Sequence, residues 1–199
     1  NSFAKSYIVN RAGEAALAAA KTSALVVNIG GDLVVRGALT EAVNIADPKA
    51  DAENSDPIAR VLVRNRAVAT SGNYRRGVQI AGHWYSHIVD PRTGQPVDHV
   101  ISATVVAPQA TDAGALATTF NVLTPAESLK LAASMPGVEC LLITKDGQEM
   151  MSPGWRALAA PLPPVKNIIT SAPVQGWDPS FELTINLEIA RITEQQPVV

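Results

Sequence analysis

The sequence predicts a fold of the α+β class, in which mixed or antiparallel sheets pack against a few helices. Three features of the 199-residue chain support this class. An alanine-rich helical pattern opens the chain, a series of short β-branched runs follows, and two capped helical patterns lie in the second half. Hydrophobic residues make up 47% of the chain, so it has enough apolar material for a core.

The first half of the chain begins with a helix and continues as strands. Residues 2–21 are expected to be helical, because alanine is abundant and apolar positions recur on one face. Two β-branched runs occupy residues 23–37, and the pair Gly30-Gly31 between them indicates a bulge or a close backbone approach. Further strands are expected at 41–48, 58–63, 67–72 and 83–90.

The second half predicts a strand, two helices and a hairpin. These elements are expected at 101–108, 111–123, 124–137 and 138–152. Asp112 is placed to cap the first helix, and Thr124 with Glu127 forms a capping box for the second. Residues 1–158 are therefore expected to form one domain. A proline-rich linker is expected at 159–180, and residues 181–199 contain a strand-like pattern that pairs with this domain or begins a second one.

Composition excludes several classes of partner. A formal net charge of −2 gives no electrostatic reason to expect nucleic acid. No apolar run reaches the roughly 18 residues that a membrane span needs. The single cysteine, Cys140, lies in an apolar run and is expected to be a buried small hydrophobe.

His87 directly precedes a sharp turn and allows two interpretations. The turn is Asp-Pro-Arg-Thr-Gly at residues 90–94. A neutral imidazole beside a reacting hydroxyl could take its proton as a general base. Alternatively, His87 hydrogen-bonds its own turn, with Asp90 and Thr93 as partners. Asp90 itself is expected to be structural, because Asp-Pro begins turns.

Five stretches of the sequence, in this order, carry a resemblance to a known family. They are FAKSYIVNRA (3–12), VNIGGDLVVRG (27–37), AVATSGNYRR (67–76), YSHIVDPRTGQPV (85–97) and TVVAPQATDAGALATTFNVL (104–123). Together they resemble the signatures of the FAD:protein FMN transferases, the ApbE family. The resemblance covers residues 2 to about 155 and only the C-terminal two thirds of a typical family domain.

The resemblance implies an enzyme with FAD as its substrate and Mg²⁺ as its metal. Such an enzyme transfers FMN from FAD to a threonine or serine hydroxyl of an acceptor protein and releases AMP. Positioning and charge neutralisation dominate reactions of this kind. The alternatives are a non-catalytic flavin-binding or protein-interaction relative that has lost the metal, and an FAD pyrophosphatase in which water replaces the hydroxyl.

The resemblance also assigns roles to residues. His87 becomes the candidate catalytic base, and Ala4 (through its carbonyl), Asp112 and Thr118 become the candidate metal ligands. The candidate flavin-binding residues are Lys5, Tyr7, Asn28, Gly30, Gly31, Asp32, Ser71, Gly72, Tyr74 and Ile88. Trp84 and Tyr85 either stack on a ring of the flavin or belong to the core.

The chain departs from the family pattern where a metal ligand is expected. The family places an aspartate four residues before the threonine, on the same helix face, but Gly114 occupies that position here. Asp112 lies six residues before Thr118, so it serves only from irregular backbone ahead of the helix. Ser6 replaces a glycine of the family pattern, and Asn10 and Asn73 replace aspartates. These changes favour altered or weakened metal binding.

Two expectations concern the surroundings of the chain. A domain that lacks its first third exposes an apolar face, so we expect a companion fragment or subunit that covers it. The family is mostly periplasmic or tethered outside the inner membrane, and the same compartment is expected here.

Overall fold

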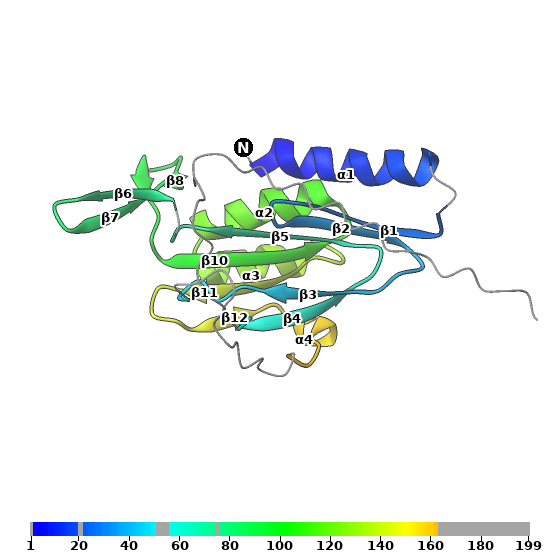
Figure 1. Cartoon of the computed structure of the whole chain (residues 1–199). Coiled ribbons are helices and arrows are strands. Elements are labelled where there is room, and N and C mark those ends of the chain that lie inside the picture. The colour runs from blue at the N-terminus through cyan, green and yellow to red at the C-terminus, as the bar shows by residue number, and fades with distance from the viewer. Residues whose placement is uncertain (1, 20–21, 51–55, 75, 163–199) are drawn as a thin grey trace, which may run out of the picture.

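The computed structural model describes residues 2–19, 22–50, 56–74 and 76–162, and its centre is a six-stranded antiparallel sheet (Figure 1). The strand order is β1-β2-β5-β10-β11-β12. The bounds are β1 Ala24–Ile29, β2 Asp32–Gly37, β5 Ala67–Gly72, β10 Val100–Ala107, β11 Glu139–Thr144 and β12 Glu149–Met151. Side chains alternate between the two faces of a strand, so Val105 of β10 enters one core and its neighbour Val106 the other.

Three helices cover one face of the sheet: α1 (Ser2–Ala19), α2 (Ala110–Val122) and α3 (Pro125–Ser134) (Figure 1). Val9 of α1 and Phe120 of α2 are fully buried in the core beneath them. A Cβ at Gly13 would lie 3.2 Å from Val34 Cγ1, so glycine lets α1 approach β2 closely. No helix within the described residues is both long and apolar enough to cross a bilayer.

The opposite face carries a second, smaller layer. It consists of the hairpin β3 (Glu41–Ile45) and β4 (Ala59–Val63) with the short helix α4 (Trp155–Leu158). Trp155 is almost fully buried against this layer. Beyond α4, Ala159 pairs with Val61 and the Ala160 N–H donates to the Arg60 carbonyl at 2.8 Å. The body of the fold therefore includes the first residues of the linker expected at 159–180. The rest of that linker, from residue 163, and the tail at 181–199 lie outside the described residues.

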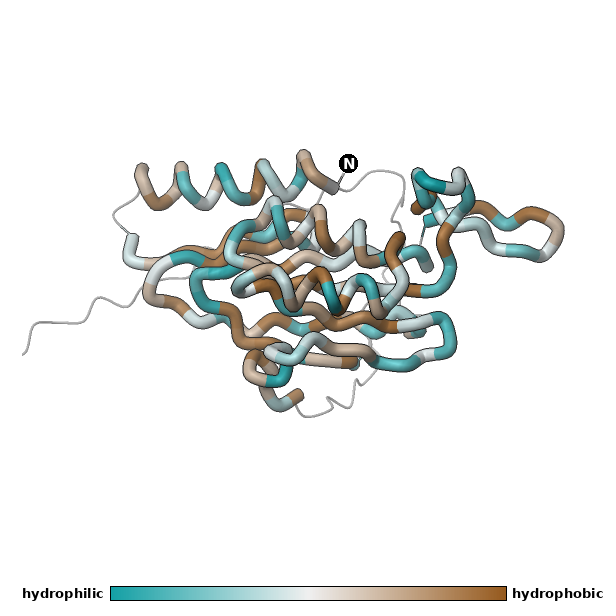
Figure 2. The backbone as a smooth tube through the Cα atoms, turned by 180° about the vertical axis from the view of Figure 1, so that it is seen from behind, coloured by the Kyte–Doolittle hydropathy of each residue, from teal (hydrophilic) through white to brown (hydrophobic). Residues whose placement is uncertain are grey.

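Two small hairpins project from one end of the sheet (Figure 1). The first pairs β6 (Gly77–Ile80) with β7 (His83–Ser86), and the second pairs β8 (Val89–Asp90) with β9 (Gln95–Pro96). The strand expected at 83–90 is thus two strands, interrupted at His87 and Ile88. Hydrophobic segments of the first hairpin lie far from the body of the protein (Figure 2).

The structure corrects two expectations about local structure. Gly30 and Gly31 form the turn of the β1–β2 hairpin, with φ of 55° and 88°, and are not a bulge. Asp112 lies in the first turn of α2, whose N-cap is Gln109, so it does not cap the helix. The capping box of Thr124 and Glu127 at the start of α3 is confirmed.

Candidate functional site

Most of the predicted site residues gather at the end of the sheet from which the hairpins project. Leu33 of β2 pairs with Val68 of β5, and the strands are antiparallel. Continuing this register places the Gly30-Gly31 turn level with Thr70 and Ser71, at the end of β5. The β1–β2 turn and the end of β5 therefore form one continuous edge.

An ion pair joins the start of α1 to this edge. The Lys5 ammonium lies 2.7 Å from Asp32 Oδ1 and donates to the Gly30 carbonyl at 3.1 Å. The Ser6 hydroxyl donates to Asp32 Oδ2 at 2.7 Å, and Asp32 is only 4% exposed. Both carboxylate oxygens are thus engaged by the protein itself. Asp32 therefore orients the β1–β2 turn, and other residues form the surface that a ligand would contact.

The turn leaves open space above its backbone. A Cβ at Gly30 or Gly31 would meet no atom within 4 Å. The Gly31 N–H is held by Asn28 Oδ1 at 3.1 Å, which fixes the shape of the turn. Tyr7, one helical turn beyond Ala4 on α1, is exposed. The backbone of this turn is therefore accessible to a ligand from the side on which other residues carry a Cβ.

The end of β5 is contacted by the last turn of α2 and by the ring of Tyr74. Asn121 Nδ2 donates to the Ser71 carbonyl at 3.0 Å, which places the last turn of α2 over this strand. A Cβ at Gly72 would lie 2.4 Å from the Tyr74 ring. Only glycine at position 72 lets Tyr74 pack back against β5.

Asn73 is structural, and its position needs an amide. Its Nδ2 donates to the carbonyls of Val100 at 2.9 Å and Val97 at 3.2 Å, and the residue is 4% exposed. An ionised carboxylate accepts hydrogen bonds only, so an aspartate in this orientation would face two carbonyl oxygens. In this chain Asn73 therefore serves to hold the fold at the end of β5.

His87 is exposed, and its ring is oriented by a backbone carbonyl. Both its backbone N–H, at 3.2 Å, and its Nδ1, at 3.0 Å, contact the Arg76 carbonyl. Because a carbonyl only accepts, this contact places a hydrogen on Nδ1, and of the two neutral tautomers it favours the one that leaves Nε2 without hydrogen. The lone pair then lies on Nε2, as a general base requires.

The turn after His87 is stabilised without it. The partners of His87 are not Asp90 and Thr93, as one interpretation of the sequence held, because Arg92 occupies Asp90 through its backbone N–H and its guanidinium. These hydrogen bonds hold the pKa of Asp90 below its usual range. Ile88 is buried, and its carbonyl accepts from the Val97 N–H at 2.9 Å. Asp90 is structural, as expected, and Ile88 supports the site from below.

The predicted metal ligands do not converge on one helix face. Asp112 lies inside α2, so Thr118, six residues later, is rotated by about 600° and displaced by about 9 Å along the axis. Arg36 Nη2 contacts the Pro108 carbonyl at 3.1 Å, which places the start of α2 over the far end of β2. Within the described ranges, no three His, Cys, Asp or Glu side chains form a metal-binding group. The donors therefore fit a magnesium shell poorly.

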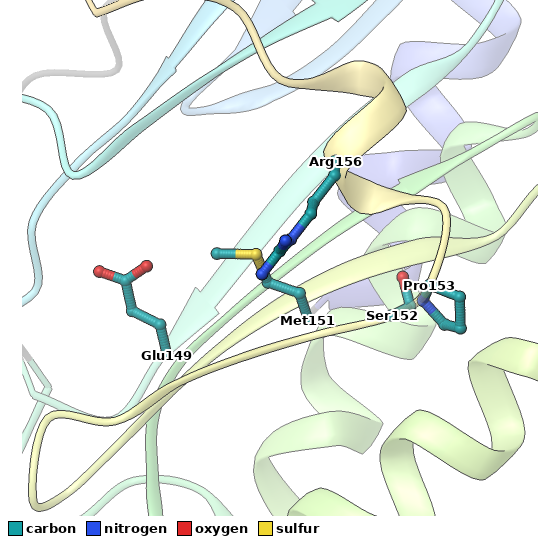
Figure 3. A pocket seen from close by; sticks show the side chains of 5 residues that line it. All are labelled: Glu149, Met151, Ser152, Pro153 and Arg156. Atoms are coloured by element: carbon teal, nitrogen blue, oxygen red, sulfur yellow. The ribbon is translucent and has the colours of Figure 1, made fainter.

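The two remaining candidates for chemistry lie away from this edge. A pocket of about 430 Å³ is lined by Glu149 and Met151 of β12, by Ser152 and Pro153 that follow it, and by Arg156 of α4 (Figure 3). It shares no residue with the edge described above. Burial raises the pKa of the Cys140 thiol to about 11, which keeps it protonated and unreactive at neutral pH.

Four residues that shape the site had no assigned role in it, although Trp84 was considered for stacking on the flavin and Ser6 and Asn73 were noted as departures from the family pattern. They are Ser6, Asn73, Trp84 and Asn121. Trp84 is 40% exposed and is therefore not a core residue. Its indole Nε1 donates to the Asn73 carbonyl at 3.0 Å. The sequence contains no local signal for these contacts, since their partners lie 11 to 50 residues away.

Known proteins resemble this chain in sequence. The family model described as the ApbE family matches residues 1–142. The FAD:protein FMN transferase of Escherichia coli K12 is 34% identical over 141 residues, which are 68% of this chain and 40% of that protein. That of Treponema pallidum is 36% identical over 164 residues, 76% of this chain and 44% of that protein. This chain thus spans less than half the length of these relatives.

Solved structures resemble it in fold. The ApbE protein of Thermotoga maritima has 31% identity and a TM-score of 0.71, covering 80% of this chain and 52% of that one. The Pseudomonas stutzeri flavinyl transferase ApbE has 28% identity and a TM-score of 0.63, covering 79% and 50%. The α+β fold predicted from the sequence is confirmed.

Proposed function

Because this chain belongs to the ApbE family, we propose that it forms part of a transferase that moves FMN from FAD to a threonine or serine hydroxyl of an acceptor protein. The orientation of His87 carries the proposal. Its Nδ1 is engaged by the Arg76 carbonyl, so Nε2 is the basic nitrogen. The open Gly30-Gly31 turn on the same end of the sheet supports it as the place for the flavin nucleotide.

The reaction assigns one proton to His87. The acceptor hydroxyl oxygen forms a bond to the phosphorus on the FMN side of the diphosphate, and the bond from that phosphorus to the AMP oxygen breaks. The hydroxyl proton passes to His87 Nε2, and AMP leaves as a phosphate monoester. Lys5 lies beside the turn, but Asp32 already neutralises it at 2.7 Å. Its part is therefore to hold the turn in place.

The proposal assigns no step to a metal ion. A divalent cation beside the diphosphate would neutralise developing charge, and Ala4, Asp112 and Thr118 remain the residues predicted to hold it. Since Asp112 and Thr118 point from different faces of α2, we propose that this chain binds Mg²⁺ weakly. This also favours the second candidate function, a flavin-binding relative without catalysis.

Restoring the carboxylate should restore metal affinity. Gly114→Asp would place a carboxylate one turn before Thr118 on the same face. We expect the Kd for Mg²⁺, measured by titration calorimetry with the ion alone, to fall at least about tenfold, or 1.4 kcal/mol. Ala115→Asp adds the same charge on a different face of the helix and should leave Kd unchanged. Equal gains in the two variants would contradict the proposal. Gly114 is buried, so each Tm is recorded as well.

The function is tested with FAD and a threonine-bearing acceptor peptide, with and without Mg²⁺. Mass spectrometry should detect peptide that has gained FMN, together with AMP. AMP without labelled peptide would identify the pyrophosphatase. FAD binding without either product would identify the non-catalytic relative, and no FAD binding by the chain together with its companion would exclude all three.

We also propose a companion segment or subunit, corresponding to the length of the relatives that this chain does not span. Phe3 and Ile8, on the outer side of α1, are 61% and 56% exposed, and Val78 and Ile80 of β6 are exposed as well. An interface with a companion would bury these exposed apolar side chains. We place the assembly in the periplasm or outside the inner membrane, on the family resemblance.

The companion is tested on the purified chain. We expect it to self-associate or to bind a hydrophobic dye, and Phe3→Ser with Ile8→Glu to reduce either effect. A chain that stays folded and monomeric, and binds no dye without a partner, would rule the companion out. A tagged chain fractionated from cells tests the compartment.

A further inference from the structure

We propose that Trp84 is a positioning residue that fixes the tautomer of His87, acting through the β6–β7 hairpin. The inference deepens the proposed function, because it concerns the same base. It stands on three consecutive contacts, from Asn73 to Trp84, from Trp84 to the hairpin, and from the hairpin to His87. Each contact is a hydrogen bond or a close packing contact between described residues.

The first contact has a rigid starting point. Asn73 is buried and is held from both sides, because its backbone N–H donates to the Ile101 carbonyl at 3.1 Å while its amide binds the Val97 and Val100 carbonyls. Its own carbonyl, directly after β5 and beside the start of β10, is therefore a fixed acceptor. The Trp84 indole N–H donates to it at 3.0 Å.

The second contact joins the indole to the opposite strand. A Cβ at Gly77 would lie 2.6 Å from Trp84 Cζ2 and 2.3 Å from the Tyr85 carbonyl, so the indole rests directly on the glycine. Residues 77–80 and 83–85 are all exposed, so burial alone gives this hairpin little stability. The indole therefore ties both strands to the body of the protein.

The third contact reaches the imidazole. Arg76 immediately precedes Gly77, and its carbonyl is the acceptor for both the backbone N–H and Nδ1 of His87. Because His87 directly follows β7, the carbonyl moves away from the ring only if the pairing of β6 with β7 opens at this end. The neutral imidazole then has no fixed acceptor that selects hydrogen on Nδ1, and its basic nitrogen is no longer defined.

The test reads the tautomer directly. Long-range ¹H–¹⁵N NMR is recorded on the labelled chain above the pH at which the histidine signals stop changing, with His87→Gln as the assignment variant. We expect a single Nδ1–H tautomer in the wild type and a mixture in Trp84→Phe, which keeps a ring over Gly77 but loses the donor. Tyr85→Phe, the matched control on the same strand, should retain the single tautomer. An Nδ1–H tautomer in folded Trp84→Phe, or Nε2–H in the wild type, would overturn the proposal.

A second variant and a kinetic readout separate this proposal from the proposed function. Gly77→Ala should displace both the indole and the Tyr85 backbone carbonyl, and so shift the tautomer by disturbing the hairpin without removing the indole donor. Where FMN transfer is measurable, Trp84→Phe should lower kcat about tenfold with KM for FAD nearly unchanged, because the loss concerns proton transfer and not binding. A shifted tautomer in a chain that transfers no FMN would count against the transferase alone.

Discussion

His87→Ala should lower the rate of FMN transfer by about 10²- to 10⁴-fold, the usual contribution of a general base. FAD binding and Tm should change little, because His87 is exposed and its ring makes one hydrogen bond, to the Arg76 carbonyl. The measurement is labelled acceptor peptide against time, at saturating FAD. Added imidazole should recover part of the lost rate, since it supplies the missing base.

A histidine on the same hairpin provides the matched control. His83 lies on β7, with its ring 4.8 Å from that of Tyr85. His83→Ala removes an exposed imidazole close in sequence, and we expect a transfer rate within about twofold of the wild type. If the two variants lose activity equally, or if imidazole rescues neither, His87 is not the base.

Asp32→Ala should give the largest loss of stability at the site, about 2 kcal/mol. The substitution removes the ion pair with Lys5 and the hydrogen bond from Ser6, both at 2.7 Å. The expected loss is smaller than that for a fully buried ion pair, because the Lys5 side chain is 38% exposed and solvent screens its charge. At roughly 2–4 °C per kcal/mol for a chain of this length, Tm should fall by about 4–8 °C. FAD affinity should fall as well, because the turn is released from α1.

An exposed ion pair elsewhere in the chain sets the baseline. Lys145 and Asp98 lie 2.6 Å apart, but their side chains are 64% and 62% exposed. Asp98→Ala should therefore cost less than about 1 kcal/mol, although Lys145 lowers the pKa of Asp98. The loss of stability in Asp32→Asn should lie between the losses in Asp98→Ala and Asp32→Ala. An Asp32→Ala variant as stable as Asp98→Ala would show that the junction does not hold the turn.

The sequence predicts those parts of the fold that depend on local signals. The capping box of Thr124 and Glu127 needs only four consecutive residues, and the helix that it begins lies where it was expected. The β6 strand was missed because all its residues are exposed, so it has no burial pattern to reveal it. Asp112 was misplaced by one turn because Gln109 caps α2 without a side-chain hydrogen bond, which leaves no signature.

The candidate site was predictable in its residue types but not in its contacts. Glycines at positions 30 and 31 and a histidine before a turn are visible in the sequence. The role of Asn73 is not, because its amide serves carbonyls 24 and 27 residues away. The same holds for the Arg76 carbonyl, since a backbone atom leaves no trace in residue identity. Long-range hydrogen bonds of this kind decide orientation, and only the folded structure reveals them.

The pairing of Ala159 with Val61 indicates where the protein can be immobilised for binding measurements. It fixes the last described residues to the layer beneath the sheet, while α1, α2 and α3 lie on the other face (Figure 1). The full thickness of the sheet separates the two. A biotin attached to a chain that is shortened to end at Leu162 would therefore leave the Gly30-Gly31 turn facing the solution. Binding of FAD could then be followed with this chain immobilised on a sensor surface.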